Sequence, residues 1–231
     1  MLEDNTVEIW TSADAGVAPG PAPLRIVLIG IFPPRRCGIA TFTGDLHDAL
    51  NTADPNIKCE VVAMTDEERV YNYPAAVKFA VRQNMLVDYV EAARRLNRDG
   101  VGIVSLQHEF GIFGGPAGEH VLTLLGNLRC PVVTTLHTVL ADPDPDQRRV
   151  LNAIIERSSR VIVMAEKGRE ILTGVYGAPA VKIAVIPHGA HERPRAAGPA
   201  CKEKLGLAGH DVLLTFGRLS PSTGLETMVR A

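Results

Sequence analysis

Short apolar runs alternate with amphipathic segments along most of this chain, and few folds accommodate that pattern. Runs such as RIVLIG, which ends at Gly30, are typical of strands buried on both faces, whereas 85–97 places apolar residues at helical spacing. Repeated strand–helix units joined by short loops predict an α/β protein with a Rossmann-like, doubly wound parallel sheet and helices on both faces. Strands are predicted at 24–30, 58–64, 77–81, 101–106, 131–136, 161–164 and 183–187, and helices at 39–50, 85–97, 117–128, 146–158 and 167–175.

The alternation weakens at both ends of the chain. Residues 1–23 include the Pro- and Gly-rich stretch TSADAGVAPGPAP and are predicted to be a disordered leader. The Rossmann-like domain is expected over 24–192, followed by a polar linker over 193–210 with a short helix near 201–205. The last segment, 211–231, opens with the strand-like run DVLLTFG and continues as the start of a helix. Because one strand and about two turns of helix cannot form a core, we expect this segment to be the first β-α unit of a truncated second Rossmann domain.

Composition excludes several classes of protein. The 24 basic and 26 acidic residues leave a net charge of −2, which disfavours a nucleic-acid-binding protein. The four cysteines form no C-x-x-C pair, so neither a zinc site nor a disulfide framework is predicted and a reducing compartment is favoured. No apolar run reaches the roughly 18–20 residues that cross a bilayer, and the acidic N-terminus is unlike a signal peptide. We therefore expect a cytoplasmic protein whose membrane contact is at most peripheral.

The loops that follow the strands are where a parallel sheet binds its ligands. The first is IFPPRRCGIATF, in which Gly38 lies where the chain turns into a helix. Its missing Cβ and the free amides of the helix start suit a phosphate, and Arg35 and Arg36 add positive charge. An ordinary tight turn with two solvated arginines explains the same residues equally well. The dinucleotide fingerprint G-x-G-x-x-G is absent, which disfavours an NAD-dependent oxidoreductase.

The second loop, QHEFGIFGGPAGEH, places His108 and Glu109 at the end of a strand. A zinc-protease interpretation fails because the position of the second histidine in H-E-x-x-H is occupied by Ile112. Glu109 could orient an acceptor hydroxyl or pair with an arginine. For His108 a structural, hydrogen-bonded role is the favoured alternative to a role in acceptor binding.

The third and fourth loops supply one histidine and one arginine. His137 is placed at the carboxyl end of a strand, where a neutral imidazole can exchange hydrogen bonds with a sugar hydroxyl. The following DPDPD run is predicted to be a turn and helix N-cap, not a metal site. Arg218 follows the last predicted strand and could clamp a diphosphate. A G-x-S-x-G elbow and a P-loop are both absent, so serine hydrolases and P-loop nucleotidases have no support.

Five motifs together resemble a known family. In order, they are FPPRRCGIATF, LQHEFGIFGGPAGEH, VVTTLHT, VIPHG and LLTFGRLSPSTGLE, and the chain is similar over 24–231 to the family-4-like retaining glycosyltransferases with a GT-B fold. The resemblance implies two Rossmann domains across a cleft, of which the N-terminal one binds the acceptor and the C-terminal one binds a nucleotide-sugar. It also implies hexosyl transfer, with mannose or glucose as candidate sugars, and no metal or other cofactor.

The resemblance also assigns roles to single residues. Gly38 falls on the glycine near the donor phosphates, His137 on the catalytic-site histidine that contacts the transferred sugar, and Arg218 on the arginine that neutralises the leaving diphosphate. Thr223 and Gly224 also fall on donor phosphate-binding positions of the last motif. Thr223 replaces the family lysine before this glycine, and it can hydrogen-bond a phosphate but brings no charge. The later acidic motif that holds the donor is not in the sequence. Catalysis by this chain alone is therefore not expected, unless a separate chain supplies the donor domain.

Two other functions remain open from the sequence. A non-catalytic module that binds a sugar or another ligand would need no donor domain. A Rossmann oxidoreductase is the weaker alternative, because the glycine fingerprint is missing.

Overall fold

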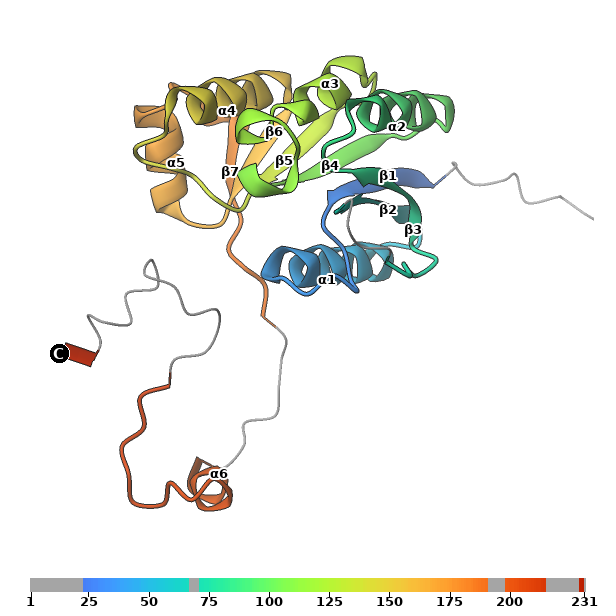
Figure 1. Ribbon diagram of the computed structural model, residues 1–231. Helices are drawn as coiled ribbons and strands as arrows, with labels where there is room; N and C mark the ends of the chain where they lie inside the picture. The colour runs from blue at the N-terminus through green and yellow to red at the C-terminus, as the bar shows by residue number, and fades with distance from the viewer. Residues whose placement is uncertain (1–22, 67–70, 191–197, 215–228, 231) are drawn as a thin grey trace, which may run out of the picture. The chain divides into compact units, whose positions relative to one another are not determined.

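The computed structural model describes residues 23–66, 71–190, 198–214 and 229–230, and the chain divides into two compact units, Met1–His188 and Gly189–Ala231. The described strands of the first unit form a seven-stranded, all-parallel sheet in the order β3-β2-β1-β4-β5-β6-β7 (Figure 1). The predicted doubly wound α/β fold is confirmed, including the strand predicted at 77–81. The strands are β1 (Leu24–Gly30), β2 (Ile57–Thr65), β3 (Val77–Arg82), β4 (Ile103–His108), β5 (Val132–Leu136), β6 (Arg160–Val163) and β7 (Ile183–Val185).

Helices cover both faces of this sheet. In Figure 1, α1 lies on one side and α2, α3 and α4 lie on the other, while α5 packs beside the β6–β7 edge. The helices are α1 (Gly38–Ala53), α2 (Leu86–Arg98), α3 (His120–Asn127), α4 (Pro145–Arg157) and α5 (Glu166–Gly174), with short 3-10 turns at Phe110–Ile112, Pro116–Gly118 and Ala180–Lys182.

Strand β1 shows why its sequence is apolar without interruption. Val27 and Ile29 belong to the core that includes α2 and α3, whereas Ile26 and Leu28 pack toward Leu46 of α1. Successive side chains of a strand point to opposite faces, so a strand with helices on both sides needs apolar residues at every position. The strand order reverses between β1 and β4, and the loops after these two strands therefore diverge at the carboxyl edge of the sheet.

The second unit contains one predicted element and lacks part of another. The short helix predicted near 201–205 is present as α6 (Gly198–Lys204). Residues 211–214 of the predicted strand DVLLTFG form no strand, and Leu213 is 82% exposed, while 215–217 lie outside the described residues. A strand needs a neighbouring strand for its backbone hydrogen bonds, and none pairs with these four residues in the described part of the chain. The chain divides at His188, whereas the boundary predicted from the sequence follows residue 192.

Within the described ranges, no helix is both long and apolar enough to span a lipid bilayer.

One buried carboxylate is held by three cations on the sheet. Glu60 of β2 is 6% exposed at its side chain, and its Oε2 lies 2.9 Å from Arg25 Nη2. Its Oε1 lies 3.2 Å from Lys58 Nζ and 3.0 Å from Lys78 Nζ. Burial by itself raises the pKa of Glu60, but the hydrogen bonds from Arg25, Lys78 and Lys58 outweigh it and hold the pKa at about 2. The group is therefore a carboxylate at any physiological pH.

Replacing this carboxylate should weaken the fold measurably. We expect Glu60→Gln to lower the free energy of unfolding by about 1–2 kcal/mol, because three cations lose their shared anion while solvent still screens them. Urea denaturation at pH 7 measures the change. Glu91→Gln is the matched control, because Glu91 forms an exposed pair with Arg95 on α2. Equal stability of the two variants would contradict the prediction.

Candidate functional site

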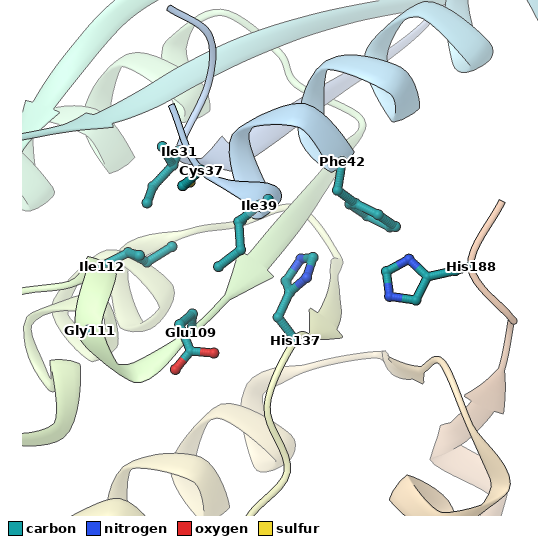
Figure 2. Close-up of a pocket in the computed structure, with 10 residues that line it drawn as sticks. Ile31, Cys37, Ile39, Phe42, Glu109, Gly111, Ile112, His137 and His188 are labelled. Carbon is teal, nitrogen blue, oxygen red and sulfur yellow. The ribbon is translucent and has the colours of Figure 1, made fainter. Parts of the chain in front are cut away.

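A cavity of about 520 Å³ opens at the carboxyl edge of the sheet, and four loops line it (Figure 2). Three of them are the loops after β1, β4 and β5 in which the sequence predicted ligand-binding residues, and the fourth follows β7. The sheet thus brings together residues that are up to 157 positions apart, from Ile31 to His188. The lining residues are Ile31, Cys37, Gly38, Ile39 and Phe42 from the first loop and α1, Glu109, Gly111 and Ile112 after β4, His137 after β5 and His188 after β7.

His137 lines this cavity from the end of β5. Its backbone N–H donates to His108 O at 3.0 Å, and its Nε2 lies 3.1 Å from Gln107 Oε1. Burial first, and then the nearby His188, lower the pKa of His137 from 6.5 to about 4. The ring is therefore neutral near pH 7, where it can exchange hydrogen bonds but is a weak base.

Phe42 and His188 are cavity residues to which the sequence analysis gave no role. The Phe42 ring packs edge-to-face on His137 at 4.9 Å between centroids and on His188 at 5.5 Å, so it contacts both histidines (Figure 2). His188 directly follows a strand in the motif VIPHG, which is the same signal that singled out His137. Phe42 lies on α1, and nothing in its local sequence indicates that it faces β5 and β7.

The start of α1 forms one wall of the cavity. Cys37 is the N-cap residue, and its Sγ accepts a hydrogen bond from the Ala40 amide at 3.3 Å. The backbone N–H groups of Gly38 and Ile39 belong to the first turn of α1, where N–H groups have no hydrogen-bond acceptor within the helix. A Cβ added at Gly38 would meet no atom within 4 Å. Packing within the protein therefore does not require glycine here, and the position offers free backbone amides to a ligand.

Glu109 lines the cavity and also holds two loops together. Its Oε1 accepts a hydrogen bond from the Phe110 amide at 3.0 Å, which caps the 3-10 turn, and its Oε2 accepts a hydrogen bond from the Thr138 hydroxyl. Of the two roles open from the sequence, the arginine pair is not formed within the described residues. The carboxylate instead joins the loop after β4 to the loop after β5.

The two arginines of the first loop are not among the residues that line the cavity. Arg35 Nη1 lies 2.8 Å from Asp66 Oδ1 at the end of β2, and the Tyr71 hydroxyl donates to the same carboxylate. Arg36 is exposed. Arg35 thus ties the loop after β1 to the loop after β2, and Arg36 is the more accessible charge of the pair.

His108, an acceptor-side candidate, lies in the core and not in the cavity. The side chain is 0% exposed, stacks on Phe113 and meets Phe110 edge-to-face. Burial, together with the nearby His137, lowers its pKa to about 3. The structural role favoured for His108 is only partly met, because neither ring nitrogen has a hydrogen-bond partner among the described residues.

The remaining predictions concern metal and donor binding. Asp144 is the N-cap of α4 and forms a capping box with Gln147, so the predicted N-cap within DPDPD is confirmed. No cluster of three or more His, Cys, Asp or Glu side chains suited to a metal occurs in the part of the chain that the structure describes. Arg218, Thr223 and Gly224, the predicted donor-binding residues, lie outside the described residues.

Comparisons with known proteins assign most of the first unit to one family. The sequence profile of Glycosyltransferase Family 4 matches residues 36–192. Two relatives are both named D-inositol 3-phosphate glycosyltransferase. The protein from Kineococcus radiotolerans is 30% identical over 44% of this chain and 27% of its own length, and that from Actinosynnema mirum is 34% identical over 44% and 28%. The matched region therefore spans little more than a quarter of either relative.

Two solved structures share the fold. The apo form of the lipopolysaccharide outer core galactosyltransferase WaaB superposes with a TM-score of 0.52 at 13% identity, covering 72% of this chain and 46% of that chain. A glycosyltransferase from Rickettsia africae gives a TM-score of 0.55 at 14% identity, covering 81% of this chain and 50% of its own. At such low identity these structures show likeness of fold alone.

Proposed function

The chain belongs to Glycosyltransferase Family 4, and on that premise we propose that it takes part in transferring a sugar from a nucleotide-sugar to a hydroxyl acceptor. The observation that supports this most is the cavity itself, which joins a helix start suited to phosphate with neutral and acidic groups suited to sugar hydroxyls. We propose that it binds the acceptor and the transferred sugar. A retaining mechanism with mannose or glucose is part of the same proposal.

The chemistry of the lining residues suits binding and orientation. A neutral His137 can exchange hydrogen bonds with a hydroxyl, while the first-turn amides of α1 favour a phosphate group. Glu109 can accept a hydrogen bond from an acceptor hydroxyl through a lone pair that Phe110 and Thr138 leave free. Arg218 and Thr223 would contact the donor diphosphate, and a second chain that supplies a donor domain remains part of the proposal.

Ligand titration tests this proposal. D-inositol 3-phosphate, which appears in the names of both relatives, is the first acceptor probe, beside inositol and a panel of UDP- and GDP-sugars. We expect calorimetry to detect binding of the acceptor probe and little binding of nucleotide-sugars. An assay of nucleotide release should detect no turnover by this chain alone. Tight nucleotide-sugar binding with turnover would mean that this chain holds a donor site of its own. If the chain binds glycans but neither the phosphorylated acceptor probe nor any nucleotide-sugar, the non-catalytic sugar-binding module is favoured.

A pair of glycine variants tests whether the acceptor probe binds in the cavity. We expect Gly38→Ala to weaken binding of the acceptor probe by about tenfold, because its methyl group enters the cavity, while stability is unchanged or slightly higher. Gly174→Ala is the control, since a Cβ at Gly174 of α5 also meets nothing within 4 Å but the residue does not line the cavity. Equal affinities for the two variants would place the ligand elsewhere.

A further inference from the structure

We propose that Gln107 is a positioning residue that fixes the tautomer of His137, so that the imidazole presents an unprotonated Nδ1 to a ligand hydroxyl in the cavity. The identity of the ligand group rests on the proposed function. The state of the ring rests on contacts within the protein, and it is measured without any ligand.

The hydrogen bonds of Gln107 define which ring nitrogen carries the hydrogen. Gln107 is fully buried on β4, and its Nε2 donates to Ser105 Oγ at 3.1 Å. This leaves Oε1 to face His137 Nε2, at 3.1 Å. A carbonyl oxygen only accepts, so this arrangement puts the hydrogen on His137 Nε2.

The other ring nitrogen then keeps its lone pair. A neutral imidazole has a single N–H, and Nδ1 of His137 has no hydrogen-bond partner among the described residues. A ligand hydroxyl can donate to this nitrogen. A carboxylate or phosphate oxygen carries no hydrogen and would face the lone pair unfavourably. Position 137 thereby favours an uncharged sugar or polyol hydroxyl over an anionic group.

The fold makes room for this glutamine at the border between β1 and β4. A Cβ on Gly30, the last residue of β1, would lie 2.8 Å from Gln107 Cβ, which is too close for a real contact. Glycine at this position lets the Gln107 side chain lie across the strand end. The ring of His137 is held further by its own backbone bond to β4 and by the edge-to-face contact with Phe42.

Nuclear magnetic resonance of the whole chain, labelled with ¹⁵N in its histidines, tests the proposal. Long-range proton–nitrogen correlations show which ring nitrogen is protonated, and comparison with His137→Ala assigns the signals. We expect wild-type His137 to hold its hydrogen on Nε2 between pH 6 and pH 8. Gln107→Leu should release the ring into a mixture of tautomers. Gln107→Glu should keep the hydrogen on Nε2 and raise the pKa of His137 by about 1–2 units, because a carboxylate favours the imidazolium.

A matched variant separates positioning from loss of stability. Thr134→Val on β5 removes a buried hydrogen bond to Ser158, the C-cap residue of α4, and should leave the tautomer unchanged. If Gln107→Leu does not fold, the wild-type spectrum and the pKa of His137 in Gln107→Glu still test whether Gln107 fixes the tautomer. A hydrogen on Nδ1 in the wild type, an unchanged tautomer in folded Gln107→Leu, or an unchanged pKa in Gln107→Glu would each overturn the proposal.

Discussion

Gly114→Ala should lower the free energy of unfolding by about 3 kcal/mol. A Cβ at this position would lie 2.1 Å from the carbonyl oxygen of Gln83 and 2.6 Å from His120 Nδ1. The neighbouring backbone cannot move aside easily, because the Tyr89 hydroxyl accepts from the Gly114 amide at 3.1 Å and donates to Gln83 O at 2.7 Å. The methyl group must therefore break this arrangement or displace the whole loop after β4.

Gly111→Ala is the control for this prediction. Gly111 lies in the same loop, yet a Cβ there meets no atom within 4 Å, so its stability should stay within about 0.5 kcal/mol of the wild type. Urea denaturation followed by far-ultraviolet circular dichroism measures both variants. Because Gly111 and Ile112 line the cavity, a displaced loop in Gly114→Ala should also weaken ligand binding. A Gly114→Ala protein as stable as Gly111→Ala would show that the loop adapts without cost.

Acid should destabilise the first unit through His108. The pKa of this buried imidazole is about 3 in the folded state, below the value of 6.5 for an exposed histidine. Below pH 6.5 the unfolded chain therefore binds the proton more readily than the folded chain does. The contribution of neutral His108 to the free energy of unfolding is complete above about pH 6.5 and is lost progressively as the pH falls toward 3. Linkage gives a loss of about 2 kcal/mol at pH 5 relative to pH 8 from this residue alone.

His108→Leu should remove that share of the pH dependence. Both ring nitrogens are buried without a hydrogen-bond partner in the described part of the chain, so an apolar side chain of similar size should be tolerated at pH 8. Unfolding free energies measured from pH 8 to pH 5 should then fall by about 2 kcal/mol less than in the wild type. His137, whose pKa is also lowered, maintains part of the slope. His210→Leu, which changes an exposed histidine, should leave the slope intact, and a wild-type slope in His108→Leu would refute the prediction.

The family resemblance read from the loop motifs is confirmed by the family match over 36–192, and the fold it implied for this domain is confirmed by the sheet. Both succeeded because they depend on local patterns. An unbroken apolar run indicates a strand covered on both sides, and residues that follow parallel strands necessarily gather at one edge. His137, Glu109 and Gly38 line one cavity for that reason.

Neighbouring residues at the end of β4 show where local patterns stop being informative. His108 and Gln107 are adjacent, and the sequence drew attention to the histidine. Because successive side chains of a strand alternate, His108 points into the aromatic core while Gln107 points toward His137. Which residue of such a pair faces the site depends on which face of β4 is turned toward His137, and the sequence of β4 alone does not say which residues meet that face.

The amino-acid sequence by itself determined the order of strands and helices, the doubly wound topology and the edge of the sheet at which a ligand would bind, because backbone periodicity and the connections between parallel strands are local properties. The tertiary structure decided which polar groups remain available there. Asp66 forms a salt bridge with Arg35, and the Thr138 hydroxyl donates a hydrogen bond to Glu109 Oε2. Gln107 is hydrogen-bonded to one ring nitrogen of His137. Each of these partners lies 29 to 31 positions away in the chain, and a side chain's hydrogen-bonding capacity is set by what folding brings beside it.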